Sequence, residues 1–152
     1  MKLRYLRWLV DFVGVPVEKI GVEDGLEGRL RLQKAALLLK HLGVAPFASY
    51  RFNLYVRGPY SPELARDYYS LTESDIAPAG VELGEGKKEL LSWFISHDPY
   101  WLEIASSIVW LREAYRRAGE EEMYSILRLS KPWVKRERFG KIYRELESRR
   151  VI

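Results

Sequence analysis

The residues best suited to chemistry in this chain are few and lie far apart. Two histidines occur, His41 and His97, each near the end of a predicted helix, and there is no cysteine. A metal site needs several converging ligands, so we expect both histidines to be helix-end or core-edge residues and expect no metal site. Without cysteine, disulfides and thiol catalysis are excluded. The glycine-containing segments match neither the dinucleotide-binding pattern nor the phosphate-binding loop.

One carboxylate pair has a spacing that permits metal-ion catalysis. Asp75 lies ten residues before Glu85, which is followed by Gly86 and Lys87. Two carboxylates and a lysine can hold Mg²⁺ and position a water molecule, as in nucleases. Glycine on both sides of Glu85 argues against the central strand that such sites usually occupy. An Mg²⁺-dependent nuclease is therefore the least favoured of three hypotheses, and we expect no catalytic residue and no cofactor.

The C-terminal segment, residues 128–152, is strongly basic. From Arg128 to Arg150 there are nine Lys or Arg against three Glu, an excess of six positive charges in a chain whose net charge is +4. Such a segment could bind nucleic acid through counterion release, with Trp133, Phe139 and Tyr143 stacking on bases. The alternative is a solvated helix whose aromatic residues point into the core. A nucleic-acid-binding regulator would use Lys131, Lys135, Arg136, Arg138, Lys141 and Arg144.

The segment Arg57-Gly58-Pro59-Tyr60-Ser61-Pro62 predicts a rigid corner between a strand and a helix. Proline fixes its own φ and keeps the residue before it out of the helical region. A rigid corner presents Tyr55, Arg57 and Tyr60 at low entropic cost, and tyrosine and arginine are enriched at binding hot spots. We expect these three residues to bind a partner. For Tyr60, packing over the next helix with its hydroxyl hydrogen-bonded is an equal alternative.

Hydrophobic periodicity predicts the elements that position these residues. Residues 51–57 alternate as a short strand, and residues 79–84 alternate as its possible partner. Ser61-Pro62 and Asp98-Pro99 each combine a capping side chain with a proline suited to the first helical position. A capping box from Asp24 to Glu27 is expected to start the central helix, and Gly43 to end it. The residues expected in one core are Leu37, Leu38, Phe52, Leu54, Leu64, Ile104, Ile108 and Leu111.

The composition favours one globular domain over residues 1–152. Apolar residues make up 47% and charged residues 30% of the chain, which is typical of globular proteins. We expect a mainly α (α+β) fold of about six helices with a small β-hairpin or short strand pair. One Gln, one Asn and many Arg and Glu are typical of a thermophile protein. Asp11 interrupts the apolar N-terminal run, so we expect a cytoplasmic protein without a signal peptide and without a membrane partner.

Two motifs carry a resemblance to a known family. Leu32, Gln33 and Lys34 open an apolar helix, and Gly58-Pro59-Tyr60-Ser61 follows an aromatic-rich strand. Over residues 28–71 the chain resembles the YwgA-like proteins and the wider Panacea group of bacterial and archaeal domains. The resemblance implies a mainly helical fold, no established catalysis, and binding to other proteins as in antitoxins and proteolytic adaptors. The resemblance also implies a structural role for the motif residues Leu32, Lys34, Gly58, Pro59 and Ser61.

The sequence departs from this group at two places. Ala35-Ala36 stands where many relatives have a larger residue, and the basic C-terminal segment is not part of the shared motif. The hypothesis that we favour is a non-enzymatic interaction module that binds another protein. A nucleic-acid-binding regulator is the second hypothesis.

Overall fold

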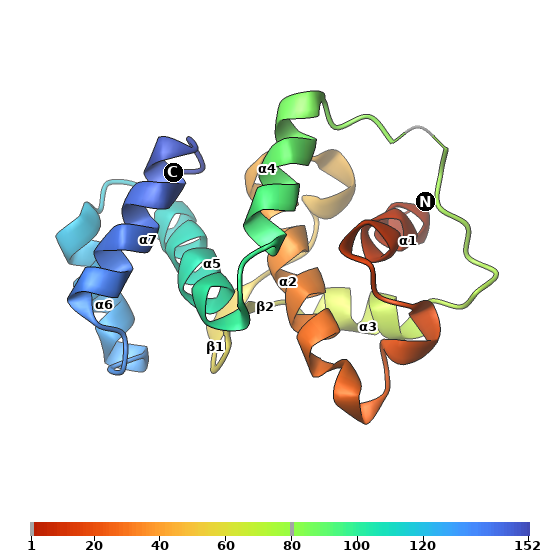
Figure 1. Cartoon of the computed structure of the whole chain (residues 1–152), viewed down its shortest axis with the longest axis horizontal. Helices are drawn as coiled ribbons and strands as arrows, with labels where there is room; N and C mark the ends of the chain where they lie inside the picture. Colours follow the sequence, from red (N-terminus) through yellow and green to blue (C-terminus); the bar gives the residue numbers. More distant parts are fainter. Residues whose placement is uncertain (1, 80) are drawn as a thin grey trace.

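The computed structural model describes residues 2–79 and 81–152. This part of the chain forms seven α-helices, three short 3₁₀ helices and one two-stranded antiparallel sheet (Figure 1). The prediction of a mainly helical fold with a small hairpin is confirmed, with one helix more than expected. The elements are α1 (Lys2–Val13), α2 (Leu26–His41), β1 (Asn53–Tyr55), β2 (Gly58–Tyr60), α3 (Pro62–Ser70), α4 (Glu85–Ile95), α5 (Pro99–Ala114), α6 (Glu120–Ser130) and α7 (Arg136–Ser148), with 3₁₀ helices at Val17–Lys19, Glu23–Gly25 and Ala45–Phe47.

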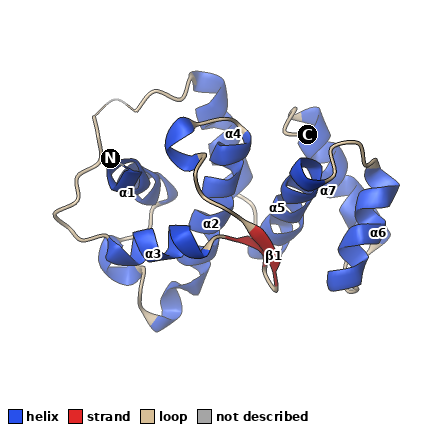
Figure 2. Cartoon of the chain, turned by 180° about the vertical axis from the view of Figure 1, so that it is seen from behind, coloured by secondary structure: helices blue, strands red, loops and turns tan. Residues whose placement is uncertain are grey.

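Helices α2 and α5 pack against each other at the centre of the molecule. Helices α1 and α4 contact α2, and α3 lies against α1, whereas α6 and α7 pack on α5. The hairpin touches both α2 and α5, and seen from behind it lies between the two groups of helices (Figure 2). Its conformation therefore depends on side chains from both groups.

Two helix starts form as the sequence predicts. The Ser61 hydroxyl accepts a hydrogen bond from the Leu64 N–H over 3.2 Å, and the Asp98 carboxylate accepts one from the Trp101 N–H over 2.8 Å. Each bond satisfies an N–H group that the first helical turn leaves without a partner. A proline occupies the first turn of both helices.

The predicted capping box at the start of α2 is wrong. The helix begins at Leu26 with Gly25 as N-cap and no side-chain cap, and Asp24 lies in the preceding 3₁₀ helix. The guanidinium of Arg29 instead donates hydrogen bonds of 2.8 Å to the carbonyls of Ile20 and Val22. A β-carbon at Gly25 would lie 2.4 Å from the Lys19 carbonyl oxygen, so this close approach requires glycine.

The predicted strand pairing is also wrong. Residues 81–84 form no strand, Gly80 lies outside the described residues, and the chain instead turns back at Val56-Arg57. Gly58 and Pro59 therefore begin a second strand rather than ending the first, with Leu54 opposite Pro59 in the register. Proline is tolerated because a two-stranded ribbon has two edges, where a missing N–H breaks no ladder.

The core is a single cluster with α2 at its centre. On α2, residues 32–39 are all buried, and the other predicted core residues are buried too, except Leu54. Leu54, on the short strand β1, is half-buried and stands outside the cluster. In the described part of the chain, no helix is long and apolar enough to cross a membrane.

Leu38→Ala is expected to lower the free energy of unfolding by about 2 to 5 kcal/mol. Leu38 is fully buried on α2, the helix against which α5 packs. The substitution removes buried methyl groups and leaves a cavity that the neighbouring helices can fill only in part. Urea unfolding measures the loss, and an unchanged midpoint would contradict the central position of α2.

Candidate functional site

Gln33, on α2, holds the backbone of Ser61 at the point where the hairpin leads into α3. Its amide nitrogen donates a hydrogen bond to the Ser61 carbonyl over 3.0 Å, and its amide oxygen accepts one from the Ser61 N–H over 2.8 Å. Both residues are buried, where polar groups need such partners because water is absent. One side chain thereby fixes both the position and the direction of the chain where α3 starts.

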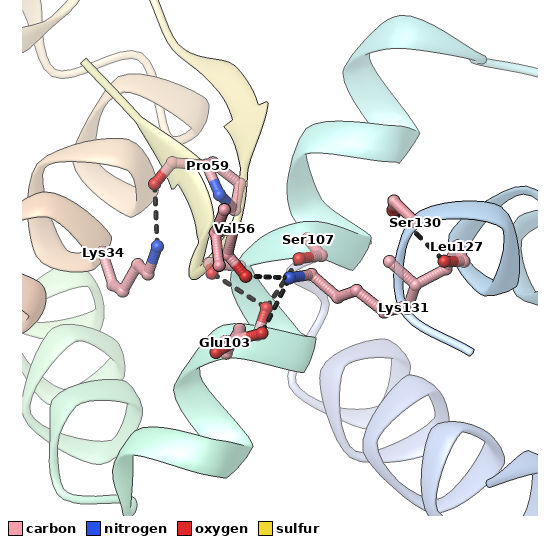
Figure 3. Close-up of polar contacts among 9 residues, drawn as sticks. Lys34, Val56, Pro59, Glu103, Ser107, Leu127, Ser130 and Lys131 are labelled. Carbon is pink, nitrogen blue, oxygen red and sulfur yellow. Dashed lines mark hydrogen bonds and ion pairs between the residues drawn. The ribbon is translucent and has the colours of Figure 1, made fainter. Parts of the chain in front are cut away.

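Two buried lysines hold the hairpin turn from opposite sides (Figure 3). Lys34 Nζ, from α2, donates a hydrogen bond to the Pro59 carbonyl over 2.7 Å. Lys131 Nζ, which follows α6, donates to the Val56 carbonyl and to the Glu103 carboxylate, each over 2.7 Å. Each lysine is only 2% exposed. Two segments that are distant in the sequence therefore bind the turn directly, and Glu103 of α5 binds one of the two lysines.

Gly58 permits this close packing. Its φ of +94° lies in the left-handed region, which side-chain-bearing residues rarely adopt. A β-carbon there would also lie 3.0 Å from Lys34 Nζ and 3.2 Å from the Glu103 carbonyl oxygen. Both the turn and the approach of the lysine therefore favour glycine at this position.

The amine of Lys34 titrates near neutrality. Burial lowers the pKa of Lys34 to about 7, since a charged ammonium loses its hydration there. Glu103 acts in the opposite direction and raises this pKa, whereas the positive charge of Lys131 lowers it further. The charge inside the hairpin corner consequently changes over the physiological pH range.

A groove of about 410 Å³ lies beside the hairpin. Side chains of α2, the hairpin and α3 line it, and most are aliphatic or aromatic. Several remain strongly exposed: Val56 is 89%, Tyr69 54%, Tyr55 48% and Leu26 43% accessible. Large apolar side chains gathered around one groove are typical of a binding surface.

The structure brings the three predicted partner-binding residues to this groove. Tyr55 and Arg57 are exposed, and among the described residues nothing binds the guanidinium of Arg57. Tyr60 is half-buried, with its ring edge-on to Tyr55 at a centroid distance of 5.7 Å. Burial raises the pKa of Tyr68 beneath the groove, and a hydrogen bond with Tyr60 acts in the same direction. Tyr60 therefore packs as the alternative predicted, while part of its side chain stays accessible at the groove, and its role in partner binding stays a prediction.

The structure separates the six predicted nucleic-acid-binding residues. Lys131 is buried under the hairpin, where a phosphate cannot reach its ammonium group. Arg136 pairs with Glu120 and Glu121, and Arg144 lies 3.4 Å from the Glu120 carboxylate. The other three, Lys135, Arg138 and Lys141, form no ion pair with any described residue.

The three aromatic residues predicted to stack on bases differ in their exposure to solvent. Phe139 and Tyr143 are buried core residues of α7, whereas Trp133 is 45% exposed. Only Trp133 of these three presents a ring that a base could reach.

The two histidines lie where the sequence predicts. His41, at the end of α2, contacts the Glu113 carboxylate over 2.7 Å, and His97 stacks on Trp101 with ring centroids 3.6 Å apart. Within the described residues no group of three potential metal-binding side chains converges.

The proposed Mg²⁺ ligands are placed only in part. The Asp75 carboxylate closes a local turn by accepting a hydrogen bond of 2.8 Å from the Thr72 N–H. The side chain of Glu85 lies outside the described residues, and Lys87 is exposed on α4.

Sequence reasoning missed Glu103 and Lys131 as parts of the hairpin corner. Glu103 occurs within the apolar α5 segment, and Lys131 within a basic segment that was interpreted either as a nucleic-acid-binding surface or as a solvated helix. A lone acidic residue in an otherwise buried helix was the available signal, because buried charges are usually paired. Nothing in the sequence identified its partners.

The comparisons with other proteins do not identify a family. No protein-family model, no curated protein and no solved structure matches this chain. The resemblance of residues 28–71 to the YwgA-like and Panacea proteins stays a prediction. The contacts of Gln33 and Lys34 give that motif a physical role that is independent of any relative.

Proposed function

We propose that this chain is a non-enzymatic, cytoplasmic interaction module whose hairpin groove holds a segment of another protein. The observation that carries the proposal is an exposed aromatic rim on a corner whose backbone is fixed from inside. Gln33 and Lys34 bind the chain on either side of Tyr60, and Lys131 binds it at Val56. A preorganised surface loses little entropy when a partner binds.

The groove favours a partner segment with apolar and acidic side chains. Tyr55, Val56 and Leu26 offer apolar area to an aliphatic or aromatic residue. Arg57 offers a guanidinium that no described residue binds, and such a group prefers a carboxylate. Binding of another protein is also what the resemblance to the Panacea group implies.

Selection from a random peptide-display library on the immobilised protein tests this proposal. The enriched peptides are expected to combine large apolar residues with an acidic residue. In fluorescence anisotropy, Tyr55→Ala combined with Arg57→Ala should weaken their binding by about tenfold or more. The melting temperature should stay nearly constant because both side chains are exposed.

A matched control is available at the far end of α5. Tyr115 is 48% exposed, as is Tyr55, and Arg117 is exposed as well. Tyr115→Ala combined with Arg117→Ala removes the same two side-chain types away from the groove, so peptide binding should be unchanged. The proposal fails if the library yields no enriched peptide, or if the groove variant binds the peptides as tightly as the control.

A further inference from the structure

A second exposed cluster lies where α5 begins and where α6 is joined to α7. The ring centroids of Tyr100 and Trp133 are 5.1 Å apart, and the guanidinium carbon of Arg138 lies 5.1 Å from the Tyr100 centroid. Tyr100 is 40% and Trp133 45% exposed. Lys131 Nζ lies 5.7 Å from the Trp133 ring, and this contact helps to hold the indole in place. The cluster therefore presents fixed aromatic surface to solvent.

Arg138 has hydrogen-bonding capacity that the protein does not use. Its Nε atom is buried and has no hydrogen-bond partner, and no described residue forms an ion pair with its guanidinium. A buried N–H group without an acceptor is rare in folded proteins and calls for an explanation. An anion bound beside Tyr100 would supply acceptors to this guanidinium.

A row of cations extends from the cluster along α7. Arg138 and Lys141 are spaced three residues apart on α7, which makes them neighbours about 4.5 Å apart along its axis, and Lys135 is the N-cap residue directly before the helix. Lys135 and Lys141 are exposed, and in the described part of the chain neither forms an ion pair. Glu137 and Glu145 are each four positions from Lys141 on α7 and so lie near it, but Glu145 accepts a hydrogen bond from the Trp101 indole, and among the described residues neither carboxylate pairs with a cation of this row. The positive charge of this row is therefore available to a ligand.

We infer that this face binds single-stranded nucleic acid, with bases stacking on Trp133 and Tyr100 and phosphates meeting Lys135, Arg138 and Lys141. Exposed aromatic rings bordered by unpaired cations match the alternation of flat bases and phosphates along a single strand. A duplex hides the faces of its bases inside the stack, and an acidic peptide would use the cations but not the rings. None of these five residues lines the hairpin groove, although Lys131 contacts both Val56 of the groove and the Trp133 ring.

Fluorescence anisotropy with a labelled oligothymidylate of about twelve nucleotides tests this inference. Three phosphate contacts predict that the logarithm of the binding constant falls with the logarithm of salt concentration with a slope of about −2. Lys141→Gln should reduce the slope by about 0.7. Trp133→Ala should weaken binding by about tenfold at fixed salt through lost stacking.

The controls test whether binding requires this face of the protein and whether it requires a single strand rather than another anionic ligand. Arg117→Gln removes an exposed charge near the opposite end of α5 and should leave binding unchanged, as should the Tyr55→Ala, Arg57→Ala groove variant. A duplex of the same length and a polyglutamate peptide should bind at least about tenfold more weakly. Absence of binding at low salt, equal binding of duplex or polyglutamate, or full affinity in folded Trp133→Ala and Lys141→Gln variants would each overturn the inference.

Discussion

Glu103→Ala is expected to lower the free energy of unfolding by about 3 to 5 kcal/mol. Glu103 lies 2.7 Å from Lys131 Nζ, and that lysine is only 2% exposed. Without the carboxylate, the ammonium of Lys131 is buried without a counter-charge. It also lies close enough to Lys34 to lower the pKa of Lys34. The cost comes mainly from this unpaired charge, because the net contribution of an intact buried pair is small. Urea unfolding of both proteins at neutral pH measures the difference.

A double variant separates the ion pair from simple loss of packing. Glu103→Ala combined with Lys131→Met removes both charges and replaces the lysine stem with an apolar side chain. Since no unpaired charge remains, it should recover most of the stability lost in Glu103→Ala. Equal stability of the single variant and the wild type would contradict the buried ion pair.

The stability conferred by the hairpin corner is expected to rise with pH through Lys34. The pKa of Lys34 is about 7 in the folded protein, against an ordinary value of 10.5 that applies when the chain is unfolded. Between these values the unfolded chain binds more protons, so the free energy of unfolding increases with pH. Below about pH 7 the cost of burying the charged lysine is fully present, and it declines as pH rises. Between about pH 6 and pH 10 the gain is expected to reach about 4 kcal/mol.

Lys34→Met provides the reference for this measurement. The variant loses the hydrogen bond to the Pro59 carbonyl, which shifts its stability by an amount that does not depend on the titration of Lys34. All other titratable groups are shared, so subtracting the two pH profiles isolates Lys34. A difference profile that stays flat between about pH 7 and pH 10 would show that Lys34 keeps its ordinary pKa in the folded protein.

The helices were largely predictable because their determinants are local. Ser61-Pro62 and Asp98-Pro99 each place a capping oxygen and a proline next to an apolar periodic segment, and both helices start there. The continuous apolar run of α2 indicated a helix covered on every side, as observed. The capping box at Asp24 failed because Arg29 stabilises the preceding turn through its side chain, and sequence spacing does not indicate such a contact.

The hairpin was only partly predictable because its second strand depends on tertiary contacts. Gly58-Pro59 is typical of a strand end, and residues 79–84 offered a better alternating pattern. The chain nevertheless turns at Val56-Arg57, where Lys34 and Lys131 bind carbonyl groups on both sides of the turn. Lysines from two distant segments supply this stabilisation, so a local pattern cannot reveal it.

The sequence indicated which residue types could form the candidate sites, but not which of these side chains are exposed and outside ion pairs. Tyr55 and Arg57 do lie at one groove, as expected of a rigid corner. The basic segment looked uniform in sequence, yet Glu120 and Glu121 on α6 pair with Arg136 and Arg144, whereas Lys135, Arg138 and Lys141 form no ion pair with any described residue. Which cations remain available depends on how two helices pack, and composition does not determine that.

The most direct test of the proposed function is to map amide chemical-shift changes when a display-selected peptide is added to the intact protein. We expect the largest changes at residues 55–60 of the hairpin and at the first turns of α2, which together border the groove. Small changes are expected on α6 and α7. Changes concentrated on α6 and α7, with the hairpin amides unmoved at saturating peptide, would contradict the hairpin groove as the site of partner binding.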